Sequence, residues 1–358
     1  MLSRQAAANL CPDDPKAHFG GPDVAPCLLR ELLKARIAAT PTTGAIRWAV
    51  YYFHDAELAE ALMRASDRGV DVRLVVEGAP HHCAVNRPVL AALRAHGLGG
   101  GLRVLHGGLP FSHPLHLHAK VYAFSHRRGS AFVGTYNPLS RPPGRALESL
   151  GDHDRGHNYL VETTDDEAIG ALSRYVDRLF SLRSWAGLRR DPEQNAVEHA
   201  DQIGFHFFPR ARVDLIEADL ARLGEGDAAF GCVSHLDDGP AAAGLAAAAA
   251  RGASVSLHLG RHSRRVDGRA LRRLHTAGAE VRLYDGPPGL PMHCKFLVLR
   301  RAAERQVLFG SFNLNAGSRW LNHEVLCRSS APSLVSAFES RFRQLRGHAR
   351  PAFKETSR

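Results

Sequence analysis

The same order of predicted secondary structure occurs twice along the chain, and this internal repeat constrains the fold more than any other feature of the sequence. Each half is predicted to run strand, helix, strand, helix, strand, and then a further strand that carries the pattern His-x-Lys. In the first half these segments are residues 45–53, 56–68, 70–78, 87–97, 102–107 and 116–124. In the second half they are residues 227–236, 245–252, 254–260, 268–278, 279–286 and 292–299.

Local signals agree with this reading and predict the fold class. Asp55 stands where an N-cap residue is expected and Gly69 where a helix ends, while Leu58, Leu62 and Ala65 share the face between them. Alternating strands and helices with short connections indicate an α/β fold. The repeat therefore predicts two similar α/β lobes, each with a mixed, largely parallel sheet flanked by helices.

The two lobes are predicted to cover residues 1–190 and 200–358. The segment 186–202 is polar, contains Pro192 and has no clear apolar period, so the join between the lobes is placed there. The apolar run that begins at Ile203 is predicted to be the opening strand of the second lobe.

The composition fits a soluble, globular protein that works on a negatively charged partner. Hydrophobic residues make up 44% of the 358 residues, and no apolar run is long enough to span a bilayer. The formal net charge of +10 favours an anionic partner such as nucleic acid or a phospholipid surface. Peripheral membrane contact stays open, and no obligate protein partner is evident. The N-terminus lacks the apolar core of a signal peptide, so we expect a cytoplasmic protein, with a secreted or periplasmic one as the alternative if a signal was trimmed.

The cysteines give no sign of a disulfide framework or of a zinc site, because they are scattered without CxxC spacing. They are Cys11, Cys27, Cys83, Cys232, Cys294 and Cys327. No metal and no other cofactor is predicted. A metal held by His116 and His118, or by His81, His82 and Cys83, is a less favoured alternative because no carboxylate stands at ligand spacing.

The residues that carry chemistry repeat together with the predicted elements. Each half has His-x-Lys on a strand, then Gly-[Ser/Thr]-x-Asn, and then a polar residue at the start of a later strand. Alternate residues of a strand point to the same face, so the His and Lys of each pair lie together. The candidate catalytic residues are His118, Lys120, Asn137, Asn158, His293, Lys295, Asn313 and Glu324, and the candidate substrate-binding residues are Thr135 and Ser311.

This set of side chains suits the cleavage of a phosphodiester. Two lysines and two asparagine amides can hold the non-bridging oxygens and stabilise the charge that develops on five-coordinate phosphorus, and Ser or Thr can add hydroxyl donors. One histidine can attack phosphorus to form a phosphohistidine, while the other protonates the leaving oxygen and later activates water or an alcohol. The lysines supply the positive charge, so we expect the reaction to be independent of metal.

These residues resemble the phospholipase D superfamily, whose repeated signature is His-x-Lys, four residues, Asp, and then Gly-Gly/Ser-x-Asn. The resemblance covers nearly the whole chain and implies two α/β lobes with the active site at the seam between them. The signature Asp falls at Ser125 in the first half and at Arg300 in the second, so both are replaced. In the family this Asp is understood as structural support, and the tyrosyl-DNA phosphodiesterase branch also lacks it.

The alignment of the halves predicts different roles for the two histidines. Glu324 is expected to accompany His293, because a carboxylate favours the imidazolium that a general acid needs. Asn158 is expected to accompany His118 and to fix its tautomer without adding charge. His118 is therefore predicted to be the nucleophile, with Asp152 or Asp154 as alternative partners, and the split resembles that of the tyrosyl-DNA phosphodiesterase branch.

Three functions fit these observations. The favoured one is a phosphodiesterase or phosphatidyltransferase that acts on a phospholipid, because aromatic residues are only 7% of the chain and the segment around Trp320 offers apolar surface. The alternative is a nuclease or nucleic-acid end-processing enzyme, which would use basic grooves and stacking aromatics. An inactive anion-binding module is the third, although binding alone would not require both histidines.

Some further residues have an open or a structural interpretation. The basic run 260–273, which includes Arg265, is either a solvated helix face or a flank of the cleft that binds a polyanion. His113 and His116 are expected to support the site rather than to react. Glu162 is expected to be a structural charge at a strand end, and Cys294 a packing residue on the opposite face of its strand.

Overall fold

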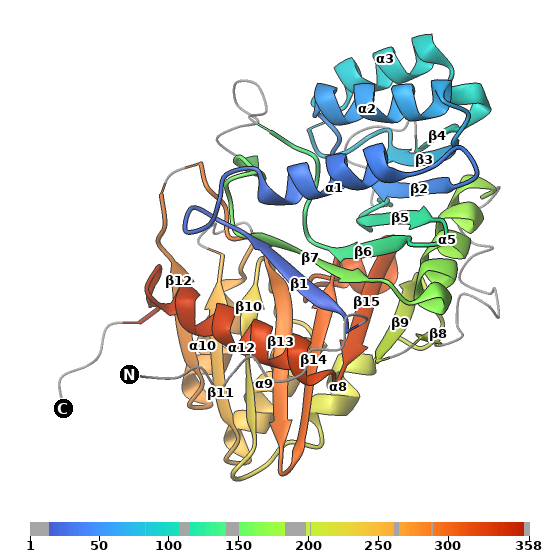
Figure 1. Ribbon diagram of the computed structural model, residues 1–358. Helices are drawn as coiled ribbons and strands as arrows, with labels where there is room; N and C mark the ends of the chain where they lie inside the picture. Colours follow the sequence, from blue (N-terminus) through green and yellow to red (C-terminus); the bar gives the residue numbers. More distant parts are fainter. Residues whose placement is uncertain are drawn as a thin grey trace, which may run out of the picture.

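The computed structural model describes residues 14–82, 84–106, 115–140, 150–182, 198–200, 202–260, 265–287 and 289–353. They form two mixed β-sheets, each flanked by helices, and each half of the chain supplies one sheet, as the repeat predicts (Figure 1). Most of the predicted join at 186–202 lies outside the described residues, so the boundaries 1–190 and 200–358 stay predictions.

The sheet of the first half has seven strands in the order β1-β7-β6-β5-β2-β3-β4. The strands are β1 Lys16–Gly20, β2 Ala45–Val50, β3 Asp71–Glu77, β4 Leu102–Leu105, β5 Val121–Ser125, β6 Ser130–Gly134 and β7 Asn158–Thr163. The helical segments are α1 Leu28–Ala39, α2 Ala56–Asp67, α3 Arg87–His96, the 3₁₀ helix η1 Leu98–Gly100 and α5 Asp166–Phe180. Helices α1, α2 and α3 share one core cluster with β2 and β3 and cover the outer face of this sheet.

The sheet of the second half has nine strands in the order β16-β12-β11-β10-β13-β14-β15-β9-β8. The strands are β8 Glu198–Ala200, β9 Ile203–Phe208, β10 Ala228–Val233, β11 Ser254–Leu259, β12 Glu280–Tyr284, β13 Lys295–Arg301, β14 Glu304–Gly310, β15 Glu324–Ser329 and β16 Ala349–Pro351. The helices are α8 Leu215–Leu220, α9 Pro240–Ala250, α10 Gly268–Thr276, α11 Ala316–Trp320 and α12 Pro332–Arg346. Helices α8, α9 and α10 lie on the outer face, where they share a second core cluster.

The sheets are mixed, as predicted, but "largely parallel" is wrong. Only β2-β3-β4 and β10-β11-β12 are parallel, and the remaining pairs are antiparallel. The His-x-Lys strands β5 and β13 run antiparallel to β2 and β10, and each turns back directly into its neighbour β6 or β14. Short reversals of this kind force antiparallel pairing, whereas the helical crossovers that predicted parallel pairing occur only earlier in each half.

The predicted helix signals and the repeat are confirmed. The Asp55 carboxylate accepts a hydrogen bond from the Leu58 backbone N–H at 2.9 Å and caps α2. Gly69 and Gly252 follow α2 and α9 at corresponding places in the two halves, and their φ angles are 93° and 94°. A side chain is strained in this left-handed region, so glycine ends both helices.

The two sheets pack against each other through their inner faces, and one hydrophobic cluster draws on both halves. Tyr159 on β7 is fully buried in this cluster, and its hydroxyl forms hydrogen bonds with the backbone of the other lobe. The hydroxyl donates to the Lys295 carbonyl at 2.6 Å and accepts from the Gly310 N–H at 2.9 Å. These bonds hold the first residue of β13 and the last residue of β14 in place.

We expect Tyr159→Phe to destabilise the protein, because it leaves buried backbone groups of Lys295 and Gly310 without this partner. Such a loss costs about 1–3 kcal/mol, which urea denaturation measures. Tyr175→Phe is the matched control, since the buried Tyr175 hydroxyl has no hydrogen-bond partner among the residues that the structure describes, and its removal should cost little. Equal losses in the two variants would contradict a role for the inter-lobe hydroxyl.

Candidate active site

The His-x-Lys strands are joined across the seam by two short backbone bridges. Leu117 pairs with His323, and Met292 pairs with His157, each in parallel orientation. The His118 N–H donates to the His323 carbonyl at 2.9 Å, and in the same way the His293 N–H donates to the His157 carbonyl at 2.9 Å. Leu117, which precedes His118, therefore pairs with the residue before β15, and Met292, which precedes His293, pairs with the residue before β7.

Each histidine has a buried acceptor on its Nδ1 atom. His118 Nδ1 lies 2.8 and 2.9 Å from the two carboxylate oxygens of Glu324, and His293 Nδ1 lies 2.9 Å from Asn158 Oδ1 and 3.0 Å from the Thr135 carbonyl. Carboxylate, amide and carbonyl oxygens accept only, so Nδ1 of each ring carries the hydrogen. Both rings line the same pocket, and Nε2 is the nitrogen left to react there.

This pairing corrects the prediction, which placed Glu324 with His293 and Asn158 with His118. Both pairs are formed across the seam, between residues of different halves. The reason is the backbone bridges, because they set the start of β15 beside the His118 strand and the start of β7 beside the His293 strand. Asp154 accepts from the Tyr136 hydroxyl instead of serving His118.

The Glu324 carboxylate is held in one orientation by neutral donors as well as by His118. Ser318 Oγ donates to it at 2.6 Å, and Ser311 Oγ donates to its other oxygen. Burial opposes ionisation of this carboxyl, but His118, Lys120 and Ser311 outweigh it and lower its pKa. Glu324 is therefore an anion inside the protein.

The hydroxyls of Thr135 and Ser311 do not face the pocket, contrary to the predicted substrate-binding role. Thr135 Oγ1 accepts from the Tyr159 N–H at 3.0 Å, and Ser311 Oγ is used by Glu324. Both residues are fully buried behind the histidines. The Thr135 hydroxyl is therefore used by the β7 backbone, and the Ser311 hydroxyl by the carboxylate that accompanies His118.

The two lysines are almost completely buried, and neither is among the residues that line this pocket. Lys120 Nζ donates to the His118 carbonyl, and Lys295 Nζ donates to the His293 carbonyl at 2.9 Å. Burial lowers the pKa of Lys120 to about 7, and burial together with the charge of Lys120 lowers the pKa of Lys295 well below its usual value. A bound anion would restore charge to both ammonium groups.

The pocket has a volume of about 610 Å³ and is lined by residues of both halves. It contains four of the predicted residues, His118, Asn137, His293 and Asn313. The other lining residues are Tyr51, Tyr52, His81, His82, His116, Leu150, His153, His235, Arg265, Asn315 and Asn322. Sequence reasoning missed Tyr51, Tyr52 and His235, although they follow β2 and β10, where ligands bind at the carboxyl ends of parallel strands.

The positions of the missing signature aspartates contact the inner helices. Ser125 Oγ lies 3.0 Å from Ser173 Oγ on α5, and Arg300 pairs with Glu339 on α12 at 2.7 Å. Cys294 is buried in the shared core, as predicted.

The structure describes some of the remaining residues that the sequence analysis singled out. Glu162 pairs with His18 at 2.9 Å and with Arg36 at 2.7 Å, which agrees with a structural charge. His116 lines the pocket beside His118. His113, Cys83 and part of the basic run at 261–264 lie outside the described residues.

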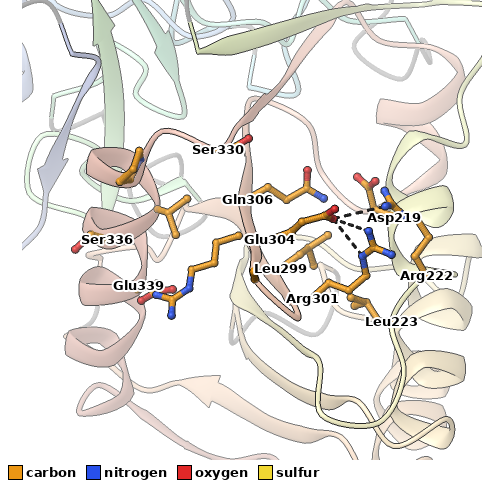
Figure 2. A pocket seen from close by; sticks show the side chains of 14 residues that line it. Asp219, Arg222, Leu223, Leu299, Arg301, Glu304, Gln306, Ser330, Ser336 and Glu339 are labelled. Carbon is orange, nitrogen blue, oxygen red and sulfur yellow. Dashed lines mark hydrogen bonds and ion pairs between the residues drawn. The ribbon is translucent and has the colours of Figure 1, made fainter.

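A second pocket, of about 600 Å³, lies in the second lobe beside the turn from β13 to β14 and beside α12 (Figure 2). Two of its arginines, Arg301 and Arg222, contact Glu304, at 2.6 and 3.6 Å. It contains none of the predicted site residues, whereas four of them line the pocket at the seam.

The described part of the chain contains no group of three or more His, Cys, Asp or Glu side chains arranged to hold a metal ion. In the same residues, every helix is too short or too polar to cross a bilayer.

Comparison with known families places this geometry in one class. Residues 34–178 and 228–346 match the family described as "Cardiolipin synthase, PLD-like domain", which covers most of both halves. The chain therefore belongs to the phospholipase D-like family and is an enzyme that hydrolyses or transfers phosphodiesters. The predicted family and enzyme class are confirmed. No curated protein matches the sequence.

Solved structures show the same fold at low sequence identity. Phosphatidylserine synthase from Haemophilus influenzae is 13% identical with a TM-score of 0.66, and the match covers 94% of this chain and 87% of that one. Polyphosphate kinase from Porphyromonas gingivalis is 15% identical with a TM-score of 0.60, over 92% of this chain. This chain covers only 50% of the length of that kinase.

The crossed pairing predicts how His118 responds to pH and to mutation. Burial lowers its pKa to about 4 despite the opposing charge of Glu324, so the ring stays neutral as the pH falls from 7 towards 5 and gains its proton only near 4. Glu324→Gln removes the charge that favours protonation, so the His118 pKa should fall further while His293 keeps its signals. Nitrogen-15 NMR of labelled histidines follows the His118 pKa and the His293 signals. A Glu324→Gln protein in which only the His293 signals change would contradict the pairing.

Proposed function

We propose that the protein cleaves a phosphodiester through a covalent phosphohistidine and passes the phosphoryl group to water or to an alcohol, with a phospholipid as substrate. The observation that carries this proposal is the crossed arrangement of His118 and His293. Each ring has its Nδ1 atom fixed by a buried acceptor from the other half, which leaves Nε2 available in one pocket. One nitrogen can then attack while the other exchanges a proton.

The phosphate group would bind above the two lysines. Their ammonium groups are buried in the first and second half respectively and supply positive charge to the non-bridging oxygens. Asn137 and Asn313 line the pocket from the two halves, and their amides can donate to the same oxygens. The symmetry of this set suits a phosphorus atom with one reacting group on each side.

We assign the attack to His118 because its ring is neutral and because its partner is the carboxylate of Glu324. The ring is neutral at rest, so its Nε2 lone pair is free to bond to phosphorus. That bond places positive charge on the imidazole, and the Glu324 carboxylate at Nδ1 stabilises it. Glu324 thus stabilises the positive charge that forms on the His118 ring during attack. It does not serve to make a histidine a general acid.

His293 would handle the protons. Burial, Lys295 and His153 lower its pKa well below the usual value, and a bound phosphodiester would add a negative charge that favours the imidazolium. As the His118–phosphorus bond forms, the bond to the leaving oxygen breaks and His293 gives that oxygen its proton. His293 then takes a proton from water or an alcohol, whose oxygen displaces His118 and breaks the phosphorus–nitrogen bond.

A phospholipid is favoured over a nucleic acid by the rim of the pocket. Trp320 is 42% exposed at the end of α11, and the residues on either side of that helix, Asn315 and Asn322, line the pocket. An exposed tryptophan beside a phosphodiester site suits the interface of a membrane, where an amphipathic ring lies at head-group depth. The family description and the phosphatidylserine synthase likeness support the same class.

Substrate assays in EDTA test the class and the metal independence together. We expect turnover of bis(p-nitrophenyl) phosphate and of mixed phospholipid vesicles, because lysines supply the charge that a metal would supply. Trp320→Ala should lower turnover on vesicles several-fold and leave the small substrate unaffected. Complete loss in EDTA with rescue by a divalent ion would refute the mechanism, and cleavage of single- or double-stranded DNA or RNA in place of lipid would point to the nuclease alternative.

Trapping the intermediate tests the roles of the histidines. Each His→Ala change should lower turnover by about a thousandfold or more, because the two rings act as a unit. His293→Ala should accumulate a phosphoryl adduct on His118 when an activated substrate with a good leaving group is used, and mass spectrometry under acid-sparing conditions detects it. An adduct on His293 in the His118→Ala protein, with none in the reverse case, would show that the roles are exchanged.

A further inference from the structure

The two halves of the chain differ at the residue that directly follows the first strand of the parallel unit. This residue is Tyr51 after β2 and Ser234 after β10. The positions are equivalent, because β2 pairs with the His-x-Lys strand β5 in the same register as β10 pairs with β13. The first lobe therefore has an aromatic ring beside its His-x-Lys pair where the second lobe has a serine.

The Tyr51 ring contacts both members of the first His-x-Lys pair. Lys120 Nζ lies over the face of the ring, 5.4 Å from its centroid, and the centroid of the His118 ring is 5.2 Å from that of Tyr51. In the second lobe, Ser234 Oγ lies 3.1 Å from His235 Nδ1. The aromatic contact to a lysine is thus a feature in which the lobes differ at equivalent positions.

The fold holds the Tyr51 ring in this place. The residue is 4% exposed, and its hydroxyl accepts a hydrogen bond from the His81 N–H at 3.0 Å. Its carbonyl accepts from Asn86 Nδ2 at 2.8 Å, and the Tyr52 ring packs against it at 4.4 Å between centroids. Contacts at the backbone, at the hydroxyl and on the ring together fix the orientation of the aromatic face.

An aromatic face attracts an ammonium group, and the attraction is stronger where water is excluded. Lys120 is fully buried, and burial lowers its pKa to about 7 although the charge of Glu324 opposes that shift. Near this pH a modest interaction with the ammonium changes the charged fraction appreciably. The titratable groups whose charges interact with Lys120 are His118, His153, His293, Lys295 and Glu324.

We infer that Tyr51 is a positioning residue for the reaction, because its ring holds the Lys120 ammonium beside His118 and favours the charged form of that ammonium. The inference rests on the proposed function, in which Lys120 supplies positive charge to the non-bridging oxygens. Ser234 offers no aromatic face to Lys295. The two lysines are therefore unequal, although the motifs that carry them repeat.

Carbon-13 NMR of protein labelled on the lysine side chains tests this inference. The chain has only the lysines Lys16, Lys34, Lys120, Lys295 and Lys354. Lys120→Arg assigns the Lys120 signal. Tyr51→Leu removes the aromatic face and should lower the pKa of Lys120 by about half a unit to one and a half units. Tyr51→Phe keeps the face and should keep the pKa. Tyr52→Leu is the matched control, since it removes the neighbouring buried tyrosine and leaves the Tyr51 ring.

Two further readouts separate this role from a loosened core. Entry of water would raise the pKa of both Lys120 and Lys295, whereas loss of the aromatic face lowers that of Lys120 and does not lower that of Lys295. Phenylalanine with one, two or three ring fluorines at position 51 keeps the shape and weakens the negative potential of the face, so the Lys120 pKa should fall stepwise. An unchanged or raised Lys120 pKa in Tyr51→Leu, or no trend with fluorine, would overturn the inference.

The pH dependence of bis(p-nitrophenyl) phosphate turnover connects the contact to the reaction. The ammonium is the active form and exists below the Lys120 pKa, so the alkaline limb of kcat/KM should move to lower pH in Tyr51→Leu by the shift that NMR measures. A limb that does not follow would show that the ring does not act on the reaction. The NMR titration needs no substrate: an expected Lys120 shift without any turnover would refute the proposed function, whereas turnover without the shift would overturn only the role of Tyr51.

Discussion

The site depends on two short backbone bridges across the seam, Leu117 with His323 and Met292 with His157. Each bridge fixes the register between the two residues that follow it, His118 with Glu324 and His293 with Asn158. Side chains alternate between faces along an extended segment, so a slip of one residue would turn Glu324 or Asn158 away from its histidine. The same hydrogen bonds that join the lobes therefore align the reacting groups.

The buried lysines explain why the site is poised for an anion. Lys120 and Lys295 are buried without a carboxylate within hydrogen-bond distance in the described residues, and burial lowers the pKa of both. A buried ammonium is unfavourable unless it is paired, and a phosphodiester supplies the missing charge. A phosphodiester bound as we propose would thus stabilise the charged form of both lysines.

The two residues that replace the signature aspartates still make a polar contact to a helix, but they make it with different chemical groups. Ser125 on β5 contacts α5, and Arg300 on β13 contacts Glu339 on α12, so both His-x-Lys strands still have a polar link to the helix on their inner face. A hydroxyl pair serves one lobe and an ion pair serves the other. These residues lie at the far end of each strand from the histidine, so the replacement leaves the histidines and their partners in place.

The sequence by itself determined the repeat, the α/β class, the family and the eight residues of the proposed catalytic set, because strand periodicity and motif spacing are local properties of the chain. It did not determine which half supplies the partner of each histidine, since Glu324 and Asn158 find their rings through bridges between segments far apart in sequence. Nor could it choose between a solvated and a pocket-facing Arg265, which depends on how the segment after β11 pairs with Leu236. The tertiary structure determines both the partners of the histidines and the position of Arg265, because packing of the two sheets brings backbone segments that are distant in sequence into register.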